Sequence, residues 1–321
     1  GLGRCGVEYL SGCRDGRSDK GGIKCFGMET RLKSGIFNPK FVSARHPQTG
    51  KPNWFCTRKL RRNEEKMEEK YLICEDSLEG VFTGVYEAYA MQEGHDHIHI
   101  QIGEEENFRL FAVYIRIAAD AEKAAKVART INQRLGIEAY LDICRALASE
   151  DGEKGEAVYK TVVCGLKMKD GSRVMGNLAD NSVHKVFELA RCTRNEVHHW
   201  KEFLRFQELE NGILFSKIGP RSNVVTFLAP HFSDRLPLFD FIIYDEKRGI
   251  FVVHPKKKEW YLVTDKDFDE KEIGAYAKEE MEYQELFTFF CHKIAIKERK
   301  NLKLQRNMLP LRFQEYMVEF G

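Results

Sequence analysis

The stretch FDFIIYDEKRGIFVVHPKKKEWYLV, at residues 239–263, decides the fold class of this chain. It contains three apolar runs, 239–244, 249–254 and 259–263, each of the length of a β-strand. Polar or glycine-containing turns separate the runs, which is typical of strands that follow one another in an antiparallel sheet. We therefore expect three adjacent antiparallel strands in this part of the chain.

Two more strand-like runs precede this stretch, at 203–208 and 212–218. They flank Glu210-Asn211-Gly212, a hairpin signal because Asn and Gly accept positive φ angles. A short helix is predicted from Ser222 to about His231. The second half of the chain is thus expected to form an antiparallel β-meander with one inserted helix.

The first half of the patterned sequence has mainly helical periodicity. Strands are predicted at 71–74, 97–101 and 110–117. The predicted helices lie after Ser77, from Asp120 to Gln133, at about 136–149 and 154–169, after Asn181, and at about 278–298 and 310–319. The expected fold class is α+β, with a helical N-terminal half and an antiparallel β-meander flanked by helices.

Residues 1–66 differ from the rest in charge and in pattern. They hold 15 Lys and Arg against 6 Asp and Glu, a net charge of +9, which leaves −7 for residues 67–321 from the total of +2. Frequent glycine and little apolar periodicity predict a poorly ordered extension. The alternatives are a basic nucleic-acid arm, a zinc site of unusual spacing, or a segment that is not native, with Met67 as the true start. The zinc ligands would be Cys5, Cys13, Cys25, His46 and Cys56.

Composition narrows the protein class. Nine scattered cysteines without a CxxC pair favour a reducing compartment, so we expect a cytoplasmic protein. No apolar run approaches the roughly 18–20 residues of a membrane span. Walker and dinucleotide loops, a nucleophile elbow and the three-cysteine cradle of radical S-adenosylmethionine enzymes are all missing, and we predict no cofactor.

Several motifs in one order resemble a known family. They are Phe82–Ala88, Lys126–Ile131, Glu196-Val197-His198, Phe203–Phe206, Pro220 with Asn223-Val224, Leu228–Phe232 with Arg235, Asp245 with Arg248, Tyr283-Gln284, Ile294–Asn301, Gln305 and Pro310-Leu311-Arg312. Residues 67–316 are similar to a bacterial family described as DNA metabolism proteins. The resemblance implies DNA repair or modification, and partners that include a radical S-adenosylmethionine protein or a uracil-DNA glycosylase-like protein. It implies no catalytic residues.

Two histidines and a carboxylate are candidates for acid–base chemistry. His231 follows Ala229-Pro230 and has the Asp234 carboxylate and the Arg235 guanidinium within a turn, so it is placed either for proton transfer or simply to hold its loop. His198 lies near a predicted helix end, where a cationic imidazole is also favourable without any function. Asp245 is the candidate to assist them.

Candidate DNA-binding residues are mainly basic. Arg205, on a predicted strand face, suits a phosphate, or a structural pair with Asp245 or Glu208. The other candidates are Arg248, Lys297, Arg299, Asn301 and Arg312. The basic C-terminal segment has aromatic residues nearby, a combination that suits unpaired bases, although an amphipathic helix with solvated charges has the same pattern.

His95, His97 and His99 form the most metal-like pattern in the chain. Alternate residues of a strand share a face, so three imidazoles there have a common direction. The alternative is a solvated strand end, and a metal is not our main expectation.

Three functions remain open from the sequence. The first is a protein that binds single-stranded or damaged DNA or serves a repair enzyme as an accessory. The second is an enzyme that acts on DNA or a nucleotide through histidine. The third is a purely structural interaction protein.

Overall fold

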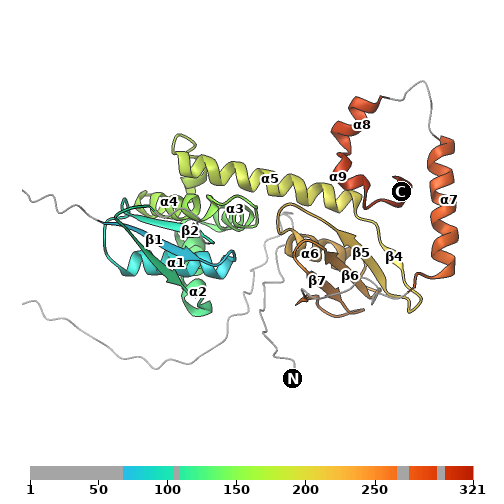
Figure 1. The fold of residues 1–321 in the computed structure, drawn as a ribbon, viewed down its shortest axis with the longest axis horizontal. Helices are drawn as coiled ribbons and strands as arrows, with labels where there is room; N and C mark the ends of the chain where they lie inside the picture. The colour runs from blue at the N-terminus through green and yellow to red at the C-terminus, as the bar shows by residue number, and fades with distance from the viewer. Residues whose placement is uncertain (1–67, 104–108, 266–274, 295–300, 321) are drawn as a thin grey trace, which may run out of the picture. The chain divides into compact units, whose positions relative to one another are not determined.

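A computed structural model describes residues 68–103, 109–265, 275–294 and 301–320 (Figure 1). The chain divides between Glu65 and Lys66, and the fold below is that of the second unit. The predictions made for residues 1–66 lie outside the described residues. Two sheets with helices packed against them confirm the α+β class. No helix in the described ranges has an apolar stretch long enough to cross a membrane.

The first sheet has three parallel strands in the order β2-β1-β3. Its strands are β1 (Glu69–Cys74), β2 (Ile98–Ile102) and β3 (Ala112–Ile117). In this register Tyr71 of β1 lies between His99 and Tyr114. The strands are parallel because α1 (Leu78–Ala90) carries the chain back between β1 and β2. The sequence predicted all three strands but not their direction.

Helices cover one face of this sheet and form the first core. They are α1, α2 (Ala121–Arg134), α3 (Ile137–Leu147), α4 (Lys154–Lys167), the 3-10 turn η1 (Gly171–Gly176) and the first part of α5 (Asn181–Phe203). Leu72, Ile98 and Ile100 point from the strands into this core. Gly84 lets α1 approach β1 closely, since a Cβ there would overlap Sγ of Cys74.

Helix starts follow the expected side-chain capping. Ser77 Oγ accepts from the backbone N–H of Gly80 at 2.9 Å. Asp120 caps α2 in the same way. The cap of α5 is Asp180 and not the predicted Asn181, because the carboxylate accepts from the N–H groups of Ser182 and Val183.

The second sheet has five strands in the order β4-β5-β6-β7-β8. They are β4 (Gln207–Glu208), β5 (Leu214–Ile218), β6 (Phe241–Asp245), β7 (Ile250–His254) and β8 (Tyr261–Thr264). The hairpin between β4 and β5 is confirmed, with Gly212 at φ +77°. The three adjacent antiparallel strands predicted within residues 239–263 are confirmed as β6, β7 and β8, whereas β5 and β6 are parallel, which the predicted meander did not include. Helix α6 (Val225–Arg235) provides the crossover that parallel neighbours require.

The predicted strand at 203–208 is largely helix and connection. Helix α5 continues to Phe203, and its end is marked by the Leu204 N–H, which donates to the Trp200 carbonyl at 3.0 Å. Trp200 is 1% exposed, so packing of the helix end outweighs the strand propensity of the aromatic residues. Arg205 therefore lies in a connection and not on a strand face.

The C-terminal segment packs against the second core and α5 through residues 309–316. It comprises α7 (Lys278–Ile294), α8 (Leu302–Met308), α9 (Leu311–Gln314) and the 3-10 turn η4 (Val318–Phe320). Phe313 of α9 is fully buried, and its ring centroid lies 4.8 Å from that of Trp200. The helix predicted at 310–319 is thus broken into α9 and η4.

Candidate functional site

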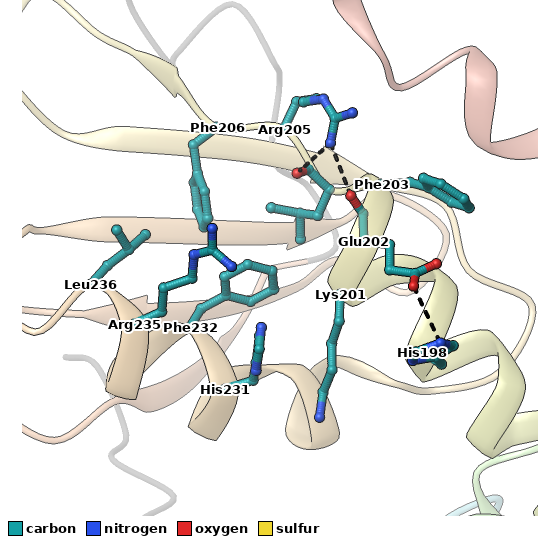
Figure 2. Close-up of a pocket in the computed structure, with 11 residues that line it drawn as sticks. His198, Lys201, Glu202, Phe203, Arg205, Phe206, His231, Phe232, Arg235 and Leu236 are labelled. Atoms are coloured by element: carbon teal, nitrogen blue, oxygen red, sulfur yellow. Dashed lines mark hydrogen bonds and ion pairs between the residues drawn. The ribbon is translucent and has the colours of Figure 1, made fainter. Parts of the chain in front are cut away.

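A cleft of about 760 Å³ opens between the end of α5, the connection that follows it, and α6 (Figure 2). Its lining residues are His198, Lys201, Glu202, Phe203, Leu204, Arg205, Phe206, His231, Phe232, Arg235 and Leu236. The cleft combines residues more than 25 positions apart because α6 packs against α5. It is the place where the structure brings several of the predicted site residues together.

The lining of the cleft is basic. Lys201, Arg205 and Arg235 supply three cations, and Glu202 is the only carboxylate among the lining residues. Within the described parts of the chain, neither Lys201 nor Arg235 forms an ion pair, so their charges are available to a ligand. This cluster stands out because residues 67–321 carry a net charge of −7.

Arg205 is held in place by other parts of the chain. Its guanidinium pairs with Glu319 of η4 at 2.9 Å and donates to the Glu202 carbonyl at 3.1 Å. The predicted pairing with Asp245 or Glu208 is wrong, because Arg205 lies outside the sheet. The result is a cation with a defined position at the rim of the cleft (Figure 2).

Aromatic side chains form an apolar floor. The ring of Phe206 lies 5.3 Å from that of Phe232 and 5.5 Å from that of Phe241, in edge-to-face arrangements. Leu236 adds a further apolar side chain to the lining. The cleft therefore combines an apolar surface with a set of cations.

Both candidate histidines lie in this cleft. His198, on α5, places Nε2 3.3 Å from Glu202, and its side chain is mostly exposed. The His231 ring lies 5.0 Å from that of Phe232 on α6 (Figure 2). His199, the next residue of α5, instead packs against Phe313, and burial lowers its pKa.

Asp245 and Arg248 lie elsewhere, in a structural network. Asp245 is fully buried and pairs with Arg248 at 3.1 Å. Burial raises the pKa of the Asp245 carboxyl, and the adjacent Arg248 guanidinium opposes that rise. Arg248 also donates to the backbone carbonyls of Pro220 and Arg221. The structure thus separates Asp245 from the two histidines that it was expected to assist.

Glu196 holds the same loop from its other side. Its carboxylate is 5% exposed and accepts from the N–H groups of Arg221 and Ser222 at 2.8 and 2.9 Å. Arg312 lies 3.6 Å from Glu196, so it is placed beside this loop and does not line the cleft. Glu196 and Arg248, which come from distant elements, therefore both hydrogen-bond to the backbone of residues 220–222.

Among the remaining candidates for DNA binding, Asn301 is described by the structure and does not line the cleft. Asn301 caps α8, where its Oδ1 accepts from the Leu304 N–H at 3.0 Å. Lys297 and Arg299 lie outside the described residues. The structure thus assigns a local structural role to Asn301.

The three histidines before and within β2 separate into two environments. His99 bonds Glu69 through Nε2 and Glu156 through Nδ1, both at 2.9 Å, while His97 lies 3.2 Å from Glu69. His95 instead meets the Tyr159 hydroxyl at 2.7 Å. Over the residues that the structure describes, no group of three or more His, Cys, Asp or Glu side chains is arranged to hold a metal ion.

The His99 network predicts a pH-dependent stability. Hydrogen bonds to Glu156 raise the pKa of His99 above its usual 6.5, and bonds from His99 and His97 lower that of Glu69. A raised pKa means that the contribution of His99 is complete below about pH 6.5 and is lost as pH rises through the folded-state value. We expect His99→Gln to destabilise the fold by roughly 1 kcal/mol near pH 6 and by less near pH 8.5.

Urea unfolding at both pH values measures this effect, with His184→Gln on exposed α5 surface as the control. A pH-independent difference between wild type and His99→Gln would show that the imidazole is not charged in the folded state.

Sequence patterns contained a signal for two cleft residues that were not proposed as site residues. Lys201 follows His198 by three residues on α5, and Arg235 follows His231 by four on α6. Residues at these spacings share a helix face. The choice of each histidine as a candidate therefore also predicted that the cation on the same face would lie near the site. Glu319 carried no such signal, because its contact with Arg205 spans 114 residues.

The protein thus has an α+β fold and a cleft that is lined by basic and aromatic side chains. The chain belongs to the family DUF4130, described as a domain of unknown function, whose model matches residues 152–319. The matched range contains every residue that lines the cleft. It leaves out the three-stranded sheet, so the resemblance of residues 67–151 stays a prediction.

Similarity to other known proteins is slight. No curated protein matches the chain. A solved structure, titled as the DHH domain of a member of a family of ribosomal proteins, is 11% identical, with a TM-score of 0.28. That match covers 58% of this chain and 73% of the other. A likeness of that degree carries no information on fold or function.

Proposed function

We propose that the protein binds single-stranded or damaged DNA in the basic cleft, as a DNA repair or DNA modification protein. The observation that supports this most is that Lys201, Arg205 and Arg235 line the same cleft as Phe206 and Phe232, with Arg235 beside the two rings (Figure 2). Cations bind the phosphates of a nucleic acid, and aromatic side chains contact its unpaired bases. The family resemblance points in the same direction.

The size of the cleft favours an unpaired segment over a duplex. Its volume of about 760 Å³ falls in the range of roughly 300–1,000 Å³ that encloses a small organic ligand. A nucleotide or two, with the base against the apolar floor and the phosphate toward the cations, matches this volume and chemistry. A lesion or a mismatch makes such a nucleotide easier to expose, because less pairing is lost.

Removing the two unpaired cations tests the proposal. We expect Lys201→Gln combined with Arg235→Gln to weaken binding of a single-stranded oligonucleotide about tenfold or more at low salt, because a hydrogen bond to a charged group contributes about 1.5–3 kcal/mol. The slope of log K against log salt should fall by about 1.4, since each single-strand phosphate contact contributes about 0.7. Fluorescence anisotropy at several salt concentrations gives both numbers.

The matched control removes two cations from another exposed helix face. Lys126→Gln with Arg129→Gln on α2 changes the net charge equally, and both side chains are exposed. If this variant weakens binding and flattens the salt slope as much as the cleft variant, binding depends on overall charge and the cleft assignment fails.

Acid–base catalysis in the same cleft is the alternative. It is favoured by one observation, that His198 and His231 line a single cleft. It would proceed without Asp245, which is buried against Arg248. Turnover of a lesion-bearing oligonucleotide that is lost in His231→Ala, with binding retained, would support an enzyme over a binding protein.

The accessory role is proposed from the resemblance alone. A radical S-adenosylmethionine protein or a uracil-DNA glycosylase-like protein would be the partner. Co-purification of either with the full chain, in the absence of DNA, tests that role separately from the cleft.

A further inference from the structure

Helix α7 carries large apolar side chains around much of its circumference, and the structure leaves them exposed. The exposed residues are Met281, Tyr283, Leu286, Phe289, Phe290 and Ile294, at 55–66% exposure. Large exposed apolar side chains that gather on one element often mark an interaction surface.

Helix α8 shows the same feature. Leu302, Leu304 and Met308 are 53–68% exposed, and α8 has no buried residue. Leu311, at the start of α9, adds a fourth exposed side chain. Both helices, which follow one another along the C-terminal part of the chain in Figure 1, therefore lack a covering layer within the described residues.

Helix α7 is held by contacts just before its first residue, and helix α8 by contacts after its last residue. Just before α7, Ala277 donates to the Glu208 carbonyl at 3.0 Å, and Tyr276 forms an isolated bridge with Leu209. Just after α8, Phe313 is buried beside Trp200. These contacts fix the start of α7 and the end of α8 on different elements, and α7 also contacts η4, yet the large apolar side chains named above stay exposed.

The two helices carry opposite charges. Near its start α7 has four glutamates, Glu279, Glu280, Glu282 and Glu285, beside Lys278. Helix α8 has Lys303 and Arg306 and no acidic residue. In the part of the chain that the structure describes, Glu282, Glu285, Lys303 and Arg306 form no ion pair. The exposed apolar residues of α7 are thus accompanied by acidic side chains, and those of α8 by basic side chains, that are unpaired among the described residues.

We propose that α7 and α8 form the interface with a second copy of this chain. A twofold axis would place α7 of one copy against α8 of its partner, so that each acidic group meets a basic group and the apolar residues cover one another. Such self-complementarity is what a closed, isologous dimer requires. A DNA strand fits the same surface poorly, because the glutamates of α7 repel phosphates.

The available area is sufficient for a stable dimer. Large side chains at this exposure each present on the order of 100 Å², so half of the ten exposed residues would supply roughly 500 Å² of apolar surface per copy. Interfaces are about 57% apolar, so this corresponds to roughly 900 Å² in total per copy, above the ~800 Å² of a standard interface.

Light scattering coupled to size-exclusion chromatography tests the proposal on the full chain. We expect a mass twice that of the chain at micromolar concentration. Glu282→Lys with Glu285→Lys should raise the dimer dissociation constant about tenfold or more, and so should Lys303→Glu with Arg306→Glu, because each places like charges in contact. All four substitutions together should restore the dimer, since the pairs are then exchanged.

Variants of the apolar residues give an independent check. Phe289→Asp with Phe290→Asp should yield a monomer, whereas Ile137→Asp, at a comparably exposed position on α3, should remain a dimer. Should the phenylalanine variant fail to fold, the charge variants still decide, because they leave the apolar surface intact.

Three outcomes would overturn the proposal. They are a monomeric wild type, a fourfold charge variant that does not regain the dimer, and charge variants that alter oligonucleotide binding while the mass stays unchanged. The last would identify the surface as a nucleic-acid contact.

Discussion

Glu196→Ala should lower the free energy of unfolding by about 3–5 kcal/mol, because it breaks a buried charged network. The Glu196 carboxylate is 5% exposed and is the acceptor for the N–H groups of Arg221 and Ser222. Its removal also leaves Arg312 without its carboxylate partner. The loop at 220–222 would then keep the bonds from Arg248 and the long hydrogen bond between the Thr193 and Ser222 hydroxyls.

Chemical denaturation gives the size of this effect, and hydrogen exchange at the Ser222 amide locates it. Glu196→Gln keeps one oxygen acceptor and should cost less than the alanine variant. Glu188→Ala is the control, since Glu188 lies on the same helix and forms only an exposed pair with Arg191 at 3.5 Å. That control should change stability by less than about 0.5 kcal/mol. Equal effects at Glu188 and Glu196 would contradict this role of Glu196.

Phe313→Ala should have an effect of similar size, about 3–5 kcal/mol, through loss of buried aromatic packing. The Phe313 ring is fully buried and lies 4.8, 5.4 and 5.6 Å from the rings of Trp200, His199 and Phe203. Truncation removes the aromatic side chain that joins α9 to the end of α5. Because Phe203 also lines the cleft, the loss should reach the candidate site.

Thermal and urea unfolding measure the loss of stability, and anisotropy with a single-stranded oligonucleotide measures its consequence for the cleft. Phe320→Ala removes the same side chain from the same segment, but at 41% exposure, and should cost less than about 1 kcal/mol. A Phe313→Ala protein as stable as the Phe320→Ala protein would show that α9 is not required for the second core.

The sequence was sufficient for most elements of the fold because their signals are local. Apolar periodicity and capping residues placed β1 to β3 and α1 to α5 close to their observed positions. The direction of β5 relative to β6 could not be predicted from local patterns, because it depends on where α6 packs. The end of α5 was misplaced for a similar reason. Contacts of Trp200 with Phe313, far along the chain, keep Phe203 helical.

Only part of the candidate site could be predicted from the sequence. His198, Arg205 and His231 were chosen for their chemistry and do share one cleft. Asp245 and Arg248 have equally suggestive chemistry, but the structure uses them to secure a loop. Sequence alone does not distinguish these uses, because a buried ion pair and a ligand-binding pair need the same residue types.

If the cleft binds a phosphate as we propose, the pairing of Arg205 with Glu319 would make the occupancy of the cleft and the docking of η4 mutually dependent. A phosphate that draws the guanidinium away from Glu319 competes with η4 for the same donor. Thermodynamic linkage is reciprocal. A change that strengthens the docking of η4 must therefore weaken the binding of that phosphate to the same degree. The turn η4 would in this way influence the affinity for phosphate of a cleft whose lining residues lie more than 80 positions before it in the sequence.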